Sequence, residues 1–144
     1  MIRISMPDPL SWETGIVYGL QALTRMTAHE IPFECLLPDS GPQYEEVAFS
    51  IYQLELDAHV RLVPYIRYRA LLSDIVVFPR LCSLEARPIK TALRLNKTVI
   101  TSDPELDFSH PKLHRFQCRD HHALANSLIS AVAGLAKVAA PEKI

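Results

Sequence analysis

The segment Ser73-Asp74-Ile75-Val76-Val77-Phe78-Pro79 decides the fold class of this chain. Its β-branched and aromatic residues, bounded by polar residues and a proline, predict a strand at residues 74–78. Comparable apolar runs before and after it predict further strands at residues 2–5, 32–37, 59–63, 98–101 and 112–116. Segments with helical periodicity separate most of these runs, and this alternation is typical of βαβ units around a parallel sheet.

The segments between the predicted strands carry apolar residues at helical spacing. These residues are Ile16, Leu20 and Leu23, then Tyr44, Val47, Ile51 and Leu54, and finally Leu124, Leu128, Val132 and Leu135. Asp120 is a suitable N-cap for the last helix. Pro88 suits the first turn of a helix that ends near Leu95, because the N–H group that proline lacks has no partner there. We therefore predict one α/β domain, residues 1–144, with a three-layer, Rossmann-like, doubly wound parallel sheet of about six strands.

The composition is that of an ordinary globular domain and disfavours some partners. The 144 residues are 49% hydrophobic and 22% charged, and a net charge of -1 offers no general attraction for nucleic acid or anionic lipid. The three cysteines, Cys35, Cys82 and Cys118, form no CxxC pair, which favours a reducing compartment. The sequence has no recognisable secretory signal and no apolar run of membrane-spanning length. We expect a cytoplasmic protein without a transmembrane segment that binds no nucleic acid.

A ligand site is expected where the order of the strands reverses. If the order is 3-2-1-4-5-6, this point lies between the first and fourth strands and brings together residues 6–14 and 79–87. The second loop leads into a helix whose free N–H groups and positive dipole end suit a phosphate. Arg80, Arg87 and Lys90 could add positive charge, although each alone also fits a solvated surface position. Trp12 fits either a stacking contact with a ligand base or a packing residue before a helix.

Four stretches of the sequence can be compared, in their order and spacing, with the segments of a known protein family. They are IPFECLLPDSGPQYEE at residues 31–46, LELDAHVRL at 54–62, SDIVVFP at 73–79, and the segment from RPI to VITSD at 87–103. In order and spacing they resemble the C-terminal domain of retaining GT-B glycosyltransferases of group 1. The resemblance implies half of a GT-B fold, which binds a UDP-, GDP- or ADP-sugar and needs no other cofactor. It also implies a partner, an N-terminal acceptor-binding domain or a separate subunit.

The sequence departs from the family at its charged donor-binding positions. Counted from Pro79, the family's two glutamates fall on Ser83 and Thr91, which cannot ionise as carboxylates do. Glu85 is two residues out of register, and the family's diphosphate-binding Arg and Lys fall near Met6 and Thr14. We therefore expect weak donor binding, with no catalytic residue and no metal ligand assigned. The predicted site residues are Trp12, Thr14, Gly15, Arg80, Ser83, Glu85, Arg87, Lys90 and Thr91.

Two functions from different classes remain open. The chain could take part in hexosyl transfer from a nucleotide sugar when paired with an acceptor domain, and be inactive alone. Alternatively, it is a non-catalytic module that binds another protein or a second copy of itself. Cys82 fits a nucleophile or, more simply, a small packed apolar group. Asp103, Glu105 and Asp107 are expected to form a solvated loop rather than a cation site.

Overall fold

The computed structural model describes residues 1–139, which alternate between strands and helices. The strands are β1 (Ile2–Ser5), β2 (Phe33–Pro38), β3 (Val60–Val63), β4 (Ile75–Phe78), β5 (Thr98–Thr101) and β6 (Leu113–Arg115). The helices are α1 (Ile16–Ala28), α2 (Tyr44–Gln53), α3 (Ile66–Ala70), α4 (Arg87–Arg94) and α5 (His121–Ala139), and a 3-10 turn covers Trp12–Thr14. Every predicted strand is present, with ends within one residue of those predicted.

The six strands found within residues 1–139 form one parallel sheet in the predicted order, β3-β2-β1-β4-β5-β6. β1 lies at its centre, where Ile4 is opposite Cys35 of β2 and Ile75 of β4. The chain moves in one direction from β1 to β3 and in the other from β4 to β6. The strand order therefore reverses between β1 and β4, and the doubly wound α/β fold class is confirmed.

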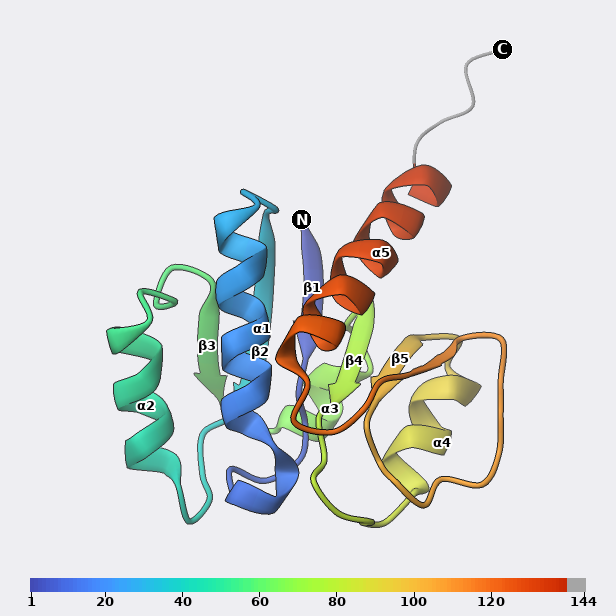
Figure 1. The fold of residues 1–144 in the computed structure, drawn as a ribbon, viewed down its shortest axis with the longest axis horizontal. Coiled ribbons are helices and arrows are strands. Elements are labelled where there is room, and N and C mark those ends of the chain that lie inside the picture. The colour runs from blue at the N-terminus through green and yellow to red at the C-terminus, as the bar shows by residue number, and fades with distance from the viewer. Residues whose placement is uncertain (140–144) are drawn as a thin grey trace.

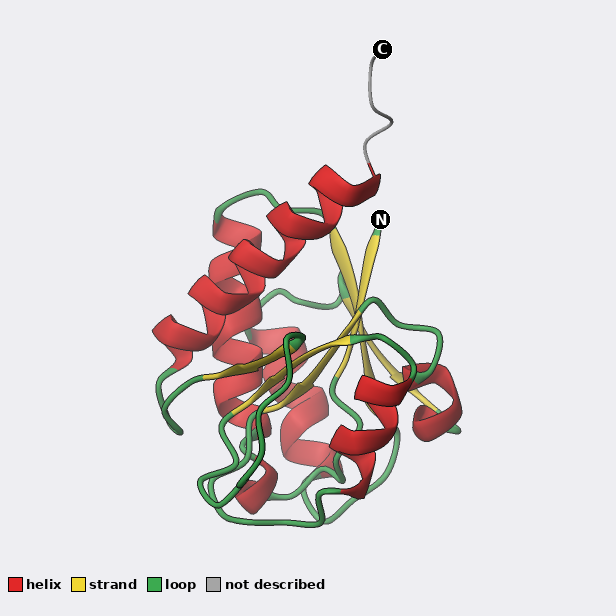
Figure 2. Ribbon diagram, turned by 90° about the vertical axis from the view of Figure 1, so that its right-hand side faces the viewer, coloured by secondary structure: helices red, strands yellow, loops and turns green. Residues whose placement is uncertain are grey.

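The helices cover both sides of the sheet and produce three layers (Figures 1 and 2). One face carries α1, α2 and α5, and α1 packs against both of the others. The opposite face carries α3, which contacts β1 and β2, and α4, which contacts β5. In Figure 2 the yellow strands are seen between these two helical layers.

Alternate residues of β4 belong to the two faces of the sheet. Ile75 and Val77 join the large buried cluster that includes residues of α1 and α5. Val76 and Phe78 join a smaller cluster with Ile89 of α4. Successive side chains of a strand point to opposite faces, and both faces of a doubly wound sheet are covered by helices. For this reason the run is apolar at every position instead of alternating between apolar and polar residues.

Helix α3 is an element that the sequence pattern does not predict. It has five residues and links β3 to β4 across the sheet. A helix of little more than one turn contains too few positions to show the 3.6-residue periodicity on which such predictions depend. Its position nevertheless matters, because it forms part of the less covered face.

The last helix begins as predicted. The Asp120 carboxylate accepts a hydrogen bond from the Ala123 N–H at 2.9 Å, as an N-cap does. Leu124 and Leu128, from its predicted apolar face, are fully buried. Although α5 has 19 residues, neither it nor any other helix in the described part of the chain is both long and apolar enough to cross a membrane.

Candidate functional site

The loops that follow β1 and β4 meet at the carboxyl edge of the sheet. The Leu81 N–H donates a hydrogen bond to the Glu13 carbonyl oxygen at 2.9 Å. Arg80 of the second loop forms an ion pair with Asp8 of the first, with a distance of 2.7 Å between Nε and the carboxylate oxygen. The two segments expected to lie together, residues 6–14 and 79–87, are therefore neighbours in the folded chain.

Thr14 and Gly15 lie where the two loops meet. The Thr14 hydroxyl is buried, 2.8 Å from the Pro9 carbonyl oxygen and 2.7 Å from that of Ser11. Gly15 has a φ of +69°, and a Cβ at this position would lie 1.6 Å from the Pro79 carbonyl oxygen. Glycine is required here by the close approach of two backbones and by the left-handed conformation. Thr14 thus braces the first loop, and Gly15 allows that loop to pack directly against the second.

A buried ion-pair network ties three loops together at the same edge. Arg80 is 1% exposed and donates to Asp8 through Nε and Nη2 and to Asp103 through Nη1, the last at 3.0 Å. Its guanidinium lies over the Phe78 ring, 5.0 Å from the centroid. Burial alone would lower the pKa of Arg80, but the hydrogen bonds and charges of Asp8 and Asp103 outweigh it. The pKa is therefore raised, and Arg80 stays protonated.

This network corrects two expectations. The sequence suggested that Arg80 adds charge to a phosphate site and that Asp103 lies in a solvated loop, but both side chains are buried. Asp103 also accepts hydrogen bonds from the backbone N–H groups of Leu84, at 3.3 Å, and Glu105, at 3.1 Å. Because two carboxylates engage the guanidinium, few of its donors remain for a ligand.

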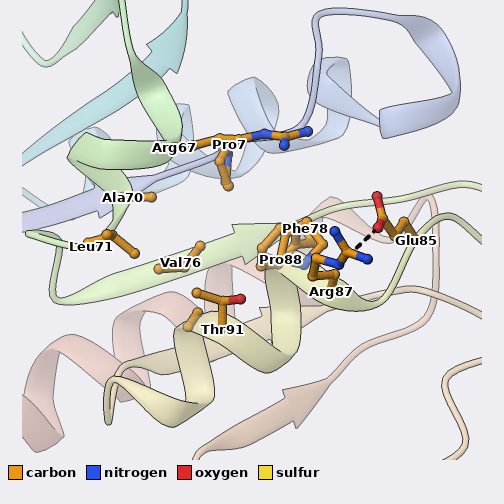
Figure 3. Close-up of a pocket in the computed structure, with 11 residues that line it drawn as sticks. Pro7, Arg67, Ala70, Leu71, Val76, Phe78, Glu85, Arg87, Pro88 and Thr91 are labelled. Atoms are coloured by element: carbon orange, nitrogen blue, oxygen red, sulfur yellow. Dashed lines mark ion pairs between the residues drawn. The ribbon is translucent and has the colours of Figure 1, made fainter.

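A cavity of about 150 Å³ lies between α3 and α4, over β4 (Figure 3). Val76 and Phe78 form its floor, Leu71 and Pro88 lie on its two walls, and Pro7 from the loop after β1 adjoins it. Pockets for drug-sized ligands usually measure about 300–1,000 Å³. The cavity is therefore large enough for one ring-sized group of a larger ligand.

Two arginines line the mouth of this mainly apolar cavity. Arg67 comes from α3 and Arg87 from the start of α4, and Figure 3 shows them on opposite walls. Arg87 forms an ion pair with Glu85 at 3.4 Å, and both side chains are largely exposed. Such a pair contributes little free energy and separates readily. Thr91 adds a hydroxyl group from α4, so the cavity suits a ring that carries an anionic group.

The structure divides the predicted site residues into groups. Three line the cavity: Glu85, Arg87 and Thr91. Three form the junction of the loops: Thr14, Gly15 and Arg80.

The remaining three predicted site residues lie outside the cavity. Trp12 is 62% exposed, so it is not the packing residue that one interpretation made of it. Ser83 is exposed in the loop after β4. Lys90 of α4 lies beside the loop between β5 and β6, where its ammonium is 5.5 Å from the centroid of the Phe108 ring.

Arg67, Ala70 and Leu71 line the cavity although the sequence did not single them out. All three belong to α3 or directly follow it, and this is the helix that periodicity does not reveal. The available signal was the position of Arg67 soon after the carboxyl end of a strand, because such ends meet at one edge of a parallel sheet.

Cys82 is not among the residues that line the cavity. Cys82 is exposed, so its interpretation as a packed apolar residue is wrong. Among the residues that the structure describes, no group of three or more His, Cys, Asp or Glu side chains could hold a metal ion.

No protein-family model and no curated protein matches this sequence. Solved structures match its fold. A glycosyltransferase from Rickettsia africae ESF-5 is 20% identical over 94% of the chain, with a TM-score of 0.81. The C-terminal domain of the glycosyl transferase group 1 family protein LpcC from Francisella tularensis is 14% identical over 92%, with a TM-score of 0.76. Anabaena HepE in complex with UDP is 17% identical over 93%, with a TM-score of 0.77.

The chain spans only part of these proteins. It covers 38% of the Rickettsia protein and 40% of the Anabaena protein, but 75% of the Francisella domain. Such coverage is expected when one domain is compared with a larger enzyme. The chain therefore has the fold of the C-terminal domain of group 1 GT-B glycosyltransferases, as the resemblance in sequence implied.

Proposed function

We propose that this chain is the donor-binding half of a GT-B-type glycosyltransferase and that the cavity between α3 and α4 receives part of a nucleoside diphosphate sugar. The observation that carries this proposal is the location of the cavity. It lies over β4, and one end of it, at Pro7 and Phe78, reaches the carboxyl ends of β1 and β4, beside the reversal of strand order, where open α/β sheets bind ligands. Anabaena HepE, which shares the fold, has been solved in complex with UDP.

The charges at the cavity support a position for each part of the donor. The diphosphate fits at the mouth, between Arg67 and Arg87, where the first N–H groups of α4 add positive potential. A ring fits over Val76 and Phe78, within reach of the Thr91 hydroxyl. The donor sugar then extends toward the loop that contains Ser83 and Glu85. In this arrangement the Arg87–Glu85 ion pair opens when the diphosphate binds.

The same residues support weak donor binding by the isolated chain. Ser83 and Thr91 replace the two glutamates that the family resemblance leads one to expect, and Arg80 is engaged by Asp8 and Asp103. Loss of one charge-assisted hydrogen bond typically lowers affinity by about 10- to 100-fold. We therefore propose that a second, acceptor-binding domain or subunit must complete the cleft before hexosyl transfer can occur.

Calorimetric titration with UDP-, GDP- and ADP-glucose tests this function. We expect weak binding of at least one of them, and we expect Arg87→Ala to weaken it about tenfold or more, because a charge-assisted hydrogen bond is lost. Arg94→Ala is the matched control. It removes the same side chain from the other end of α4, where Arg94 is exposed and away from the cavity.

The titration also separates the alternatives. Equal effects of the two substitutions would contradict the proposed diphosphate position. A micromolar dissociation constant for the unmodified chain would contradict weak binding. Absence of binding at millimolar concentrations would overturn the donor-binding function and favour the non-catalytic interaction module.

A further inference from the structure

A second hollow of about 460 Å³ lies at the carboxyl ends of β2 and β3, next to the cavity. We call it the tyrosine groove. Asp39 and Ser40 line it from the loop after β2, and Tyr65, Arg67 and Tyr68 line it from the turn between β3 and α3. Arg67 lines both hollows, so they lie on either side of its side chain.

The two tyrosine rings of the groove are available for contact. Tyr65 is 82% exposed and Tyr68 is 68% exposed, although aromatic rings are among the side chains that gain most from burial. Neither ring contributes to a buried cluster in the described part of the chain. Their exposure is therefore not explained by the packing of this domain.

The backbone at Tyr65 points to the same conclusion. Tyr65 has a left-handed conformation, with φ 56° and ψ 43°, immediately before α3. Glu30, Glu55 and Asn96 are also left-handed, but each lies just past the end of a helix, where this conformation commonly ends the helix. Arg119, two residues before α5, is left-handed as well. Tyr65, like Arg119, does not follow a helix, and the conformation is unfavourable for a residue with a Cβ.

Polar groups surround the rings and are free to meet a ligand. Within the described residues, no side-chain hydrogen bond or ion pair engages Asp39, Ser40 or Arg67. They supply a carboxylate acceptor, a hydroxyl group and a guanidinium donor, to which the two tyrosine hydroxyls are added. One negative and one positive side chain leave the groove without net charge.

We propose that the tyrosine groove binds a carbohydrate. A pyranose ring has a face of C–H groups, which packs on the electron-rich face of a tyrosine, and a rim of hydroxyls, which pairs with polar groups such as those of Asp39 and Ser40. The balanced charge suits a neutral sugar better than a polyphosphate. The choice of a sugar as ligand rests on the proposed function, and Arg67 is the residue that the groove shares with the donor cavity.

Ligand-observed saturation-transfer NMR with maltopentaose, chitotetraose and mannotetraose, in the absence of nucleotide, tests the proposal. We expect at least one of these glycans to bind, and we expect Tyr65→Ala and Tyr68→Ala each to lower its affinity about tenfold. Tyr52→Ala is the matched control, because this tyrosine of α2 is 74% exposed and does not line the groove. Circular dichroism establishes that each variant is folded.

The outcomes distinguish this site from the donor site. Arg87→Ala should leave glycan binding unchanged while weakening nucleotide-sugar binding, and Tyr65→Ala should do the reverse. Failure of all three glycans to bind at millimolar concentrations, or an equal loss in Tyr52→Ala, would overturn the carbohydrate site without affecting the nucleotide titration. Binding of uridine or adenosine that is lost in Tyr65→Ala and competes with the glycan would reassign the groove to a nucleobase.

Discussion

The face of the sheet that carries α1, α2 and α5 and the face that carries α3 and α4 are packed differently. On the first, residues such as Ile4, Leu23 and Phe33 belong to one large buried cluster. On the second, the buried cluster is small and adjoins the cavity. The small cluster consists of Val76, Phe78, Ile89, Ala92, Leu93 and Val99. The central strand β4 contributes side chains to both.

The difference follows from the lengths of the helices. α1 has 13 residues and α5 has 19, whereas α3 has five and α4 has eight. Short helices cover less of the sheet, and a gap between them remains over β4, with an arginine on each side. The molecule thus buries most of its apolar core on one face and leaves a ring-sized cavity on the other.

Arg80→Ala should have the largest effect, because the network of Asp8, Arg80 and Asp103 holds together the loops of β1, β4 and β5. Removing the arginine leaves two carboxylates without their partner in a buried place, which typically costs about 3–5 kcal/mol. Urea unfolding measures the loss. Arg94→Ala, an exposed arginine of α4, should change stability by less than about 0.5 kcal/mol. Similar results for the two variants would show that the network does not hold the loops.

Leu23→Ala should come next, with a loss of about 2–5 kcal/mol, because Leu23 is fully buried on the α1 face. Leu71→Ala is its counterpart on the cavity face. Leu71 is 37% exposed, so we expect a loss below about 1 kcal/mol. Thermal or urea unfolding of both variants measures the two losses of stability. Equal losses would contradict the difference in packing between the two faces.

Alkaline pH should reduce stability through Cys35, on β2. Burial, and to a lesser degree the charge of Glu34, raises the pKa of the Cys35 thiol. The folded chain therefore keeps the proton of this thiol, while the unfolded chain loses it above a pKa of about 8.5. The contribution of Cys35 to stability is thus complete below that pH and declines above it. The expected slope is about 1.4 kcal/mol per pH unit.

Urea unfolding between pH 8 and pH 10 tests this dependence, with pH values chosen about the thiol's ordinary pKa. Cys35→Ala should show a shallower decline than the unmodified chain. Cys82→Ala, which removes an exposed thiol, should not. Parallel declines in all three proteins would exclude Cys35 as the source.

Thr91→Glu should have the smallest effect, and we expect it to change the free energy of ligand binding at the cavity. A carboxylate at this position, within the cavity, can accept hydrogen bonds from ligand hydroxyls and should tighten nucleotide-sugar binding about tenfold. Thr91→Gln is the matched control, with nearly the same shape and no charge. If the Thr91→Glu variant binds the nucleotide sugar no more tightly than the Thr91→Gln variant in calorimetry, the absence of a carboxylate at this position is not what limits affinity.

Much of the fold could be predicted because its signals are local. β1 and β5 have the predicted bounds, and the Asp120 cap and the Pro88 position at the start of α4 were read from single residues. α3 could not be predicted, because five residues show no period. Of the candidate site, the meeting of the two loops was foreseen, and Thr91, named through the family resemblance, lines the cavity. Arg67 was not, because it belongs to that short helix.

By itself, the sequence determined which segments are strands and helices and in what order a doubly wound sheet would arrange them, since periodicity and capping act over a few residues. Only the tertiary structure decided what the charged residues do. Arg80 became part of a buried network because strand order brings Asp8 and Asp103 to it, while Arg87 stayed at an open mouth. Two arginines only seven residues apart, Arg80 and Arg87, have different roles because burial and ion pairing depend on neighbours that are distant along the chain.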